Sequence, residues 1–201
     1  MALCKAGAIV TWLCPRALAS LISDLGIETL PVDQSVKLND FDYYCPSSTL
    51  PLHFNLTIDN IDGTPYLVRP DPDRRGQLIG VMTAGNPNNI EGRPRTLTRD
   101  QATRLESLPS AINLAPESTG ARDFRETAAI VTSLEMVITV DTAVAHLAGG
   151  LGIPTIVLLP FVADWRWFTD RSDSPWYSSV RIVRQGPDLD WESVVDRALA
   201  I

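Results

Sequence analysis

Lysine is almost absent from this chain of 201 residues. The only two lysines are Lys5 and Lys37, and every later cation is an arginine. With 17 basic and 24 acidic side chains the net charge is −7, which argues against a surface for nucleic acid or anionic membrane, because such surfaces need a basic patch. The planar guanidinium group of arginine suits phosphate and carboxylate oxygens. A GC-rich coding bias explains the same preference equally well.

Cysteines and long apolar runs are also scarce. The three cysteines, Cys4, Cys14 and Cys45, are an odd number without a CxxC pair. Neither a disulfide framework nor a zinc site is therefore expected. No apolar run reaches the ~18 residues of a membrane span, and no signal-peptide pattern opens the sequence. We expect a cytoplasmic protein with reduced thiols and no stable insertion into a membrane.

Several common catalytic motifs are missing as well. The sequence contains no GxGxxG, no P-loop, no GxSxG and no cluster with metal-ligand spacing. Of the two histidines, His53 lies between Leu52 and Phe54, which suggests a packing position. We therefore predict no metal and no cofactor.

Enough apolar residues are present for a sizeable core, since 45% of the chain is hydrophobic and 20% charged. A chain of this length suits one to one and a half domains. The polar, proline-rich stretch 68–76 blocks regular pairing and predicts a linker. It would separate a partial N-terminal domain, 1–67, from a C-terminal domain, 77–201.

Strands and helices alternate along the chain. Short apolar runs predict strands at residues 8–14, 27–32, 41–45, 78–83, 111–115, 136–140, 155–159 and 180–184. Helical spacing and capping residues predict helices at residues 16–25, 98–108, 123–134, 141–151 and 190–200. This alternation indicates an α/β protein whose C-terminal domain is a doubly wound, Rossmann-like parallel sheet. The N-terminal domain would be a partial Rossmann-like layer.

The end of the strand at 136–140 carries the strongest candidate site. Asp141 is expected to cap the next helix, so that the amides of Thr142, Ala143 and Val144 face the crevice with the helix dipole behind them. Such a helix start is an anion site suited to a diphosphate. His146 would face the same way as Thr142. Alternatively, Asp141 is only a cap and His146 only packs.

Two further strand ends carry polar or aromatic loops. The loop after 78–83 contains Gly85, Asn86, Arg93 and Arg95, and its arginines could clamp phosphates or simply lie in solvent. The loop after 155–159 is dense in aromatic residues and should either stack on a ligand ring or pack over the domain edge. Its candidate residues are Asp164, Trp165, Arg166 and Trp167.

Together these segments resemble the C-terminal domain of bacterial GT-B glycosyltransferases of family nine, the group of the ADP-heptose:LPS heptosyltransferases. The resemblance is carried by residues 141–154 (DTAVAHLAGGLGIP), by 164–167 (DWRW) and by 173–177 (DSPWY). The last two segments, from Asp164 to Tyr177, look like the transferase domains found in TPR-repeat proteins. Residues 123–128, 84–95 and parts of 41–67 are also similar, so the resemblance covers nearly the whole chain. The family's opening strand and Gly-rich loop are not matched, which leads us to expect a truncated N-terminal domain.

The resemblance implies a metal-independent transfer of a hexosyl or heptosyl group from a nucleotide-diphosphate sugar to a hydroxyl acceptor. Asp141, Thr142, Ala143 and His146 would bind the diphosphate and the sugar. The two loop arginines would lie near the phosphates, and the tryptophan loop near the donor side of the cleft. No catalytic base is assigned, because the family's candidate lies in the unmatched segment.

Other functions remain open at this point. A degenerate, non-catalytic module that binds a nucleotide sugar is the main alternative, and a GT-B nucleotide-sugar epimerase is a third. The sequence does not specify the donor base, the sugar or the acceptor, and it indicates no nucleic-acid partner. A partial sheet with an open edge strand tends to pair, so a homodimer is a reasonable hypothesis.

Overall fold

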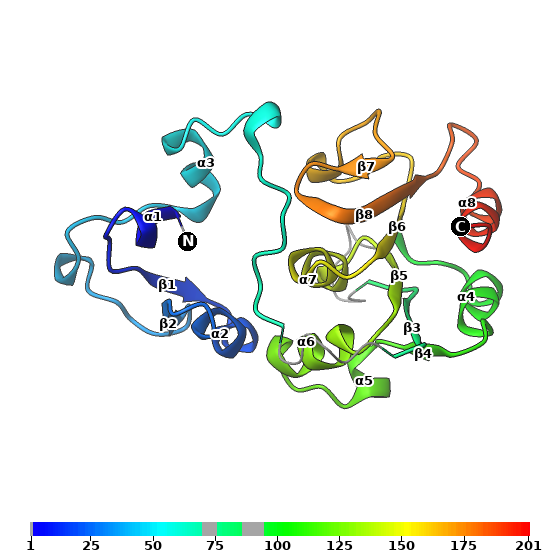
Figure 1. Ribbon diagram of the computed structural model, residues 1–201, viewed down its shortest axis with the longest axis horizontal. Coiled ribbons are helices and arrows are strands. Elements are labelled where there is room, and N and C mark those ends of the chain that lie inside the picture. The colour runs from blue at the N-terminus through cyan, green and yellow to red at the C-terminus, as the bar shows by residue number, and fades with distance from the viewer. Residues whose placement is uncertain (1, 70–75, 86–94) are drawn as a thin grey trace.

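The computed structural model describes residues 2–69, 76–85 and 95–201, and its centre is a six-stranded sheet (Figure 1). The strand order is β4-β3-β5-β6-β8-β7, and each neighbouring pair is parallel except β7 with β8. The strands are β3 (Ile79–Met82), β4 (Ala111–Asn113), β5 (Met136–Val140), β6 (Thr155–Leu159), β7 (Asp173–Ser174) and β8 (Tyr177–Arg184). The chain is thus an α/β protein with a mostly parallel sheet, as predicted.

Helices cover both faces of this sheet. The helices of the C-terminal part are α4 (Arg99–Glu106), α5 (Pro116–Thr119), α6 (Phe124–Thr132), α7 (Ala143–Leu151) and α8 (Trp191–Leu199). Along β5, Ile138 and Val140 pack with α4 and α8, whereas Val137 packs with α6 and α7. This alternation follows from the two-residue period of a strand. Because both faces are covered, β5 and β6 are almost continuously buried and apolar.

The direction of winding changes between β3 and β5. After β3 the chain passes to β4 on one side, and then returns to place β5 on the other side of β3. In open parallel sheets, ligands bind outside the carboxyl ends of the strands at such a switch point. The topology therefore marks the space beyond Met82 and Val140 as the expected crevice.

The N-terminal part contains a second, smaller sheet. In it β1 (Thr11–Cys14) pairs in parallel with β2 (Glu28–Pro31), and the helices are α1 (Ala2–Lys5), α2 (Arg16–Ser23) and α3 (Leu50–His53). Helix α2 packs on α6, where Leu21 enters the core of the larger sheet and Ser20 Oγ donates to Asp123 Oδ2 at 2.9 Å. The N-terminal part is thus attached through α2.

The strand predicted at residues 41–45 is wrong. These residues form bends and irregular backbone, and the side chains of Tyr43 and Tyr44 are 92% and 74% exposed. Aromatic residues favour strands because they pack on a pleated, half-buried surface. No neighbouring strand or helix supplies that surface here among the described residues.

Residues 66–69, which include the first two residues of the predicted linker, lie along the C-terminal end of α7. This segment is drawn in cyan between the two parts in Figure 1. The backbone N–H groups of Tyr66 and Leu67 donate to the Gly150 carbonyl at 2.9 and 3.0 Å. Arg69 Nε donates to the Leu151 carbonyl at 2.8 Å, and its Nη2 donates to the next carbonyl at 2.9 Å. These bonds satisfy carbonyls that have no partner within the helix. Most of the predicted linker, residues 70–75, lies outside the described residues.

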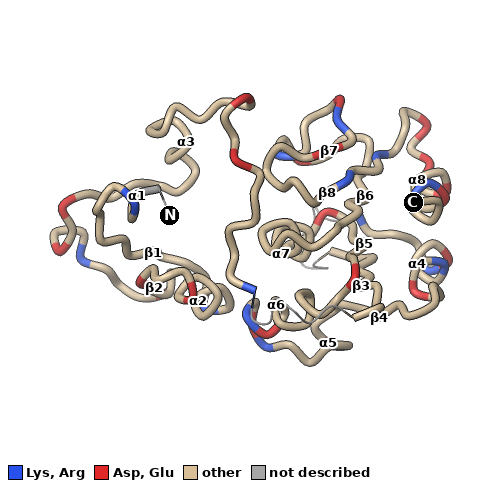
Figure 2. The backbone as a smooth tube through the Cα atoms, viewed as in Figure 1, with Lys and Arg blue, Asp and Glu red and all other residues tan. Residues whose placement is uncertain are grey.

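Charges of both signs are interspersed over the surface elements. Figure 2 shows acidic and basic positions side by side along α4, α6 and α8. Arg104 of α4 bridges Glu192 and Asp196 of α8 at 2.7 and 2.5 Å, which joins these two helices on one face of the sheet. Among the described residues, no helix combines the length and the apolar character that crossing a bilayer requires.

Candidate functional site

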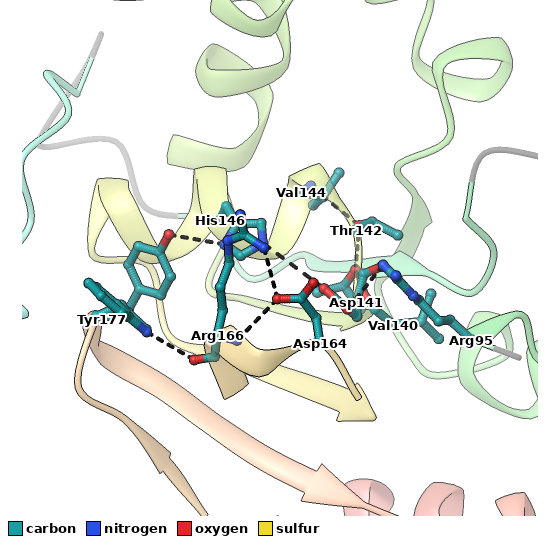
Figure 3. A network of polar contacts seen from close by, with 11 residues as sticks. Arg95, Val140, Asp141, Thr142, Val144, His146, Asp164, Arg166 and Tyr177 are labelled. Carbon is teal, nitrogen blue, oxygen red and sulfur yellow. Dashed lines mark hydrogen bonds and ion pairs between the residues drawn. The ribbon is translucent and has the colours of Figure 1, made fainter. Parts of the chain in front are cut away.

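Loops from three neighbouring strands meet at the switch point. Because β3, β5 and β6 lie side by side, the loops that follow them converge at one edge of the sheet. Arg95 comes from the first loop, Asp141 from the second and Asp164 from the third, and Figure 3 shows them pointing toward one another. The three strand ends singled out in the sequence thus form one cluster.

Asp141 and Arg95 form a buried ion pair across the switch point. Asp141 directly follows β5, and its side chain is only 4% exposed. Arg95 Nη1 lies 3.0 Å from Asp141 Oδ2 and donates to the Asp141 carbonyl at 3.3 Å. A buried carboxylate is costly unless it is paired, so Arg95 compensates the charge of Asp141 at this edge of the sheet.

The start of α7 differs from the prediction in its capping residue. Thr142, not Asp141, is the N-cap, and Thr142 Oγ1 accepts a hydrogen bond from the Val144 amide at 3.3 Å. Thr142 has extended backbone, with φ −137° and ψ 173°. The Asp141 carboxylate is turned toward Arg95 instead. One of the three amides expected to face the crevice, that of Val144, is therefore already engaged, while Ala143 opens the helix.

His146 lies one turn into α7 and is held from two sides. Its Nε2 is 4.0 Å from Asp141 Oδ1, and its Nδ1 is 3.0 Å from the Tyr177 hydroxyl (Figure 3). The imidazole stacks on Trp167, with ring centroids 5.2 Å apart and planes inclined by 17°. About a third of the side chain, 34%, remains exposed.

Burial lowers the pKa of His146 below its ordinary value, because it penalises the charged imidazolium. The nearby Asp141 carboxylate opposes this shift, and Arg166 adds to it. The imidazole is therefore neutral at pH 7. A neutral imidazole offers one donor and one acceptor.

The loop after β6 divides its aromatic residues between core and surface. Asp164 caps a short 3₁₀ turn, Trp165–Trp167, and accepts hydrogen bonds from the Arg166 amide at 3.0 Å and from Arg166 Nη1 at 2.8 Å. Trp167 is 1% exposed, whereas Trp165 is 67% exposed and has the Arg166 guanidinium 4.6 Å from its ring centroid. Of the two outcomes considered for this loop, packing therefore occurs at Trp167.

The Asp164 carboxylate is held in its charged form. Partial burial would raise the pKa of this group, but the backbone and side-chain hydrogen bonds from Arg166 outweigh burial and leave the pKa below its ordinary value. Each of the two carboxylates at the described crevice thus has an arginine partner, Asp141 with Arg95 and Asp164 with Arg166.

The remaining candidate residues are placed only in part. Gly85 lies three residues beyond β3 and is half-buried. Asn86 and Arg93 lie outside the described residues. Tyr177, at the start of β8, was missed as a site residue, although it belongs to the aromatic stretch 173–177 that the sequence made conspicuous. Its contact with His146 depends on the pairing of β8 beside β6, which the local sequence does not reveal.

This arrangement suits a ligand that carries both hydroxyls and an anionic group. Charged carboxylates accept hydrogen bonds from hydroxyls, guanidinium groups donate to phosphate oxygens, and exposed aromatic rings stack on flat or apolar surfaces. In the described part of the chain, no group of three or more His, Cys, Asp and Glu residues is arranged to hold a metal ion.

Comparisons with protein-family models, with curated proteins and with solved structures gave no match for this chain.

Proposed function

We propose that the chain is a GT-B-type glycosyltransferase similar to family nine, which takes a sugar from a nucleotide-diphosphate donor. One observation carries this proposal. The buried pair Arg95–Asp141 spans the switch point of the sheet, and His146 lies beside it at the start of a helix. A cation, a carboxylate and a neutral imidazole are thereby held close together at the edge where parallel sheets bind ligands.

We assign the donor diphosphate to the start of α7. The positive end of the helix dipole and the Arg95 guanidinium both favour anionic oxygens there. The Asp141 carboxylate, which pairs with Arg95, would repel a phosphate, so it is assigned to the hydroxyls of the transferred sugar. The exposed ring of Trp165, in the loop that follows β6, offers a stacking surface.

Transfer would proceed by attack of an acceptor hydroxyl on the anomeric carbon. The bond from that carbon to the diphosphate oxygen breaks, and the nucleoside diphosphate leaves with the bonding electrons. The helix start and Arg95 stabilise the charge that develops on the leaving group, which is electrostatic catalysis by groups already in place. The hydroxyl proton passes to a base that we do not assign to a described residue.

Binding tests this proposal directly. Isothermal titration calorimetry with UDP-glucose, GDP-mannose and ADP-glucose should show binding of at least one donor. Because His146 and Asp141 contact that donor, His146→Ala and Asp141→Asn should each weaken binding by about tenfold, the cost of one or two lost hydrogen bonds. His53→Ala, which changes the other histidine outside the crevice, is the matched control. Unchanged affinity in both site variants would overturn the assignment.

A second candidate is a module that binds a nucleotide sugar without turnover. It is favoured by the pairing of Asp141 and Asp164 with arginines, which leaves neither carboxylate at the described crevice free to accept a proton. Release of nucleoside diphosphate from the bound donor, with and without sugar acceptors, separates the two candidates. Release that is lost in Asp141→Asn supports the transferase, and tight binding without release supports the module.

A further inference from the structure

We propose that Tyr177 is a positioning residue that holds His146 in the tautomer with a proton on Nε2, so that an N–H group faces the donor. This inference deepens the proposed function and rests on it for the identity of the ligand. It assigns a role to Tyr177, which lies outside residues 141–154, the motif at α7. Three observations support this role: the placement of the Tyr177 ring, its hydrogen bond with His146 Nδ1, and the negative charge that faces His146 Nε2.

The ring of Tyr177 is fixed against α7. A Cβ atom at Gly149 would lie 2.5 Å from the Tyr177 ring, so only glycine allows the ring to lie this close to the helix. The Ser178 amide donates to the Gly63 carbonyl at 2.8 Å, which anchors the next residue of β8 to the segment that passes α7. Because the Tyr177 ring is held against α7 in this way, its hydroxyl lies beside the His146 ring.

The Tyr177 hydroxyl is protonated and is therefore available to donate to His146 Nδ1. Burial raises the pKa of Tyr177, and the neighbouring Tyr66 adds to this rise, so the phenol keeps its proton throughout the physiological range. The phenol oxygen lies 3.0 Å from Nδ1. A phenol that donates to Nδ1 requires a lone pair there, and in a neutral imidazole this places the ring proton on Nε2.

The opposite side of the imidazole favours the same tautomer. Nε2 faces the Asp141 carboxylate, with 4.0 Å between Nε2 and Oδ1. A lone pair on Nε2 would face negative charge, whereas an N–H is attracted to it. Stacking on Trp167 favours the observed plane of the ring. His146 is therefore a hydrogen-bond donor to an oxygen of the donor substrate, and its Nε2 is not free to act as a base.

Nitrogen NMR identifies the tautomer of His146 and requires no ligand. Long-range ¹H–¹⁵N spectra of the full chain labelled with ¹⁵N-histidine contain signals from only two histidines, and His53→Gln identifies those of His146. At pH 7.5 the wild type should show a protonated Nε2 and an unprotonated Nδ1. Tyr177→Phe should convert this pattern into a mixture of tautomers. Tyr43→Phe, which removes a hydroxyl from a ring that is 92% exposed, should leave the pattern unchanged.

Donor binding supplies a second measurement. If Tyr177→Phe populates the two tautomers equally, half of the molecules are competent to bind, and the affinity for the donor identified by calorimetry should fall about twofold. A protonated Nδ1 in the wild type, or an unchanged pattern in Tyr177→Phe, would overturn the positioning role even where a nucleotide sugar binds. If the pattern is as expected and no donor binds, the proposed function fails while the tautomer assignment stands.

Discussion

Replacing Arg95 by methionine should destabilise the protein more than any surface arginine substitution, because it strips a buried carboxylate of its cation. Arg95 Nη1 lies 3.0 Å from Asp141 Oδ2, and the two side chains are 24% and 4% exposed. At this separation the Coulomb attraction is about 5 kcal/mol with an effective dielectric constant of ~20. Breaking a buried pair by removing one partner costs about 3–5 kcal/mol. Because the Arg95 side chain is partly exposed to solvent, we expect a loss at the lower end of this range, about 3 kcal/mol.

A double-mutant cycle isolates the interaction from side effects of each substitution. Asp141→Asn alone should cost less than Arg95→Met, because an uncharged amide takes the place of the carboxylate and the remaining arginine reaches water. The double variant should be more stable than the sum of the single effects predicts, with a coupling energy of about 2 kcal/mol. Thermal unfolding followed by tryptophan fluorescence should show Arg95→Met melting roughly 6–12 °C below wild type.

The exposed pair Arg171–Asp173 is the matched control. Its atoms are as close, with 2.7 Å between Nη2 and Oδ2, but its side chains are 34% and 64% exposed. Solvent screens such pairs, so the cycle of Arg171→Met and Asp173→Asn should give a much smaller coupling energy. Equal coupling energies in the two cycles would refute the reasoning, because burial would then add nothing to the attraction at the crevice.

Three further predictions concern other parts of the molecule. Arg69→Met should lower the free energy of unfolding by about 1–3 kcal/mol in urea titrations, because two carbonyls at the end of α7 lose a charged donor; the exposed Arg16→Met should change it little. Burial lowers the pKa of His146, so stability should fall as the pH drops below about 6.5, and a pH series of unfolding midpoints should show His146→Gln reducing this slope. Trp167→Ala should cost about 3–5 kcal/mol in thermal unfolding, whereas Trp165→Ala, at a ring that is 67% exposed, should be nearly neutral; similar losses would contradict the assignment of one ring to the core.

The local sequence predicts those helices and strands whose formation depends only on residues close together in the chain. The bounds of β5 and β6 are those expected, because a run of β-branched and apolar residues suits only a strand buried on both faces. Thr98 and Gln101 form the expected capping box at the start of α4, since both partners lie within one turn. Such features need no information about distant parts of the chain.

Other features depend on neighbours that the local pattern does not contain. Residues 41–45 have the composition of a strand but find none to pair with, so they remain irregular. At the start of α7 both Asp141 and Thr142 are capable caps. Thr142 takes the position because Asp141 is drawn to Arg95, which lies 46 residues earlier in the chain.

The sequence by itself determined the α/β class, the central strands and the three strand ends that carry the candidate residues. Only the tertiary structure decided that these strand ends meet, because strand order is set by packing and crossover direction rather than by order along the chain. It also decided that Trp167 is buried while Trp165 is exposed, and that Tyr177 reaches His146. Each of these outcomes depends on a partner from a distant segment, and the strength of a contact depends on burial that exists only once the sheet has formed.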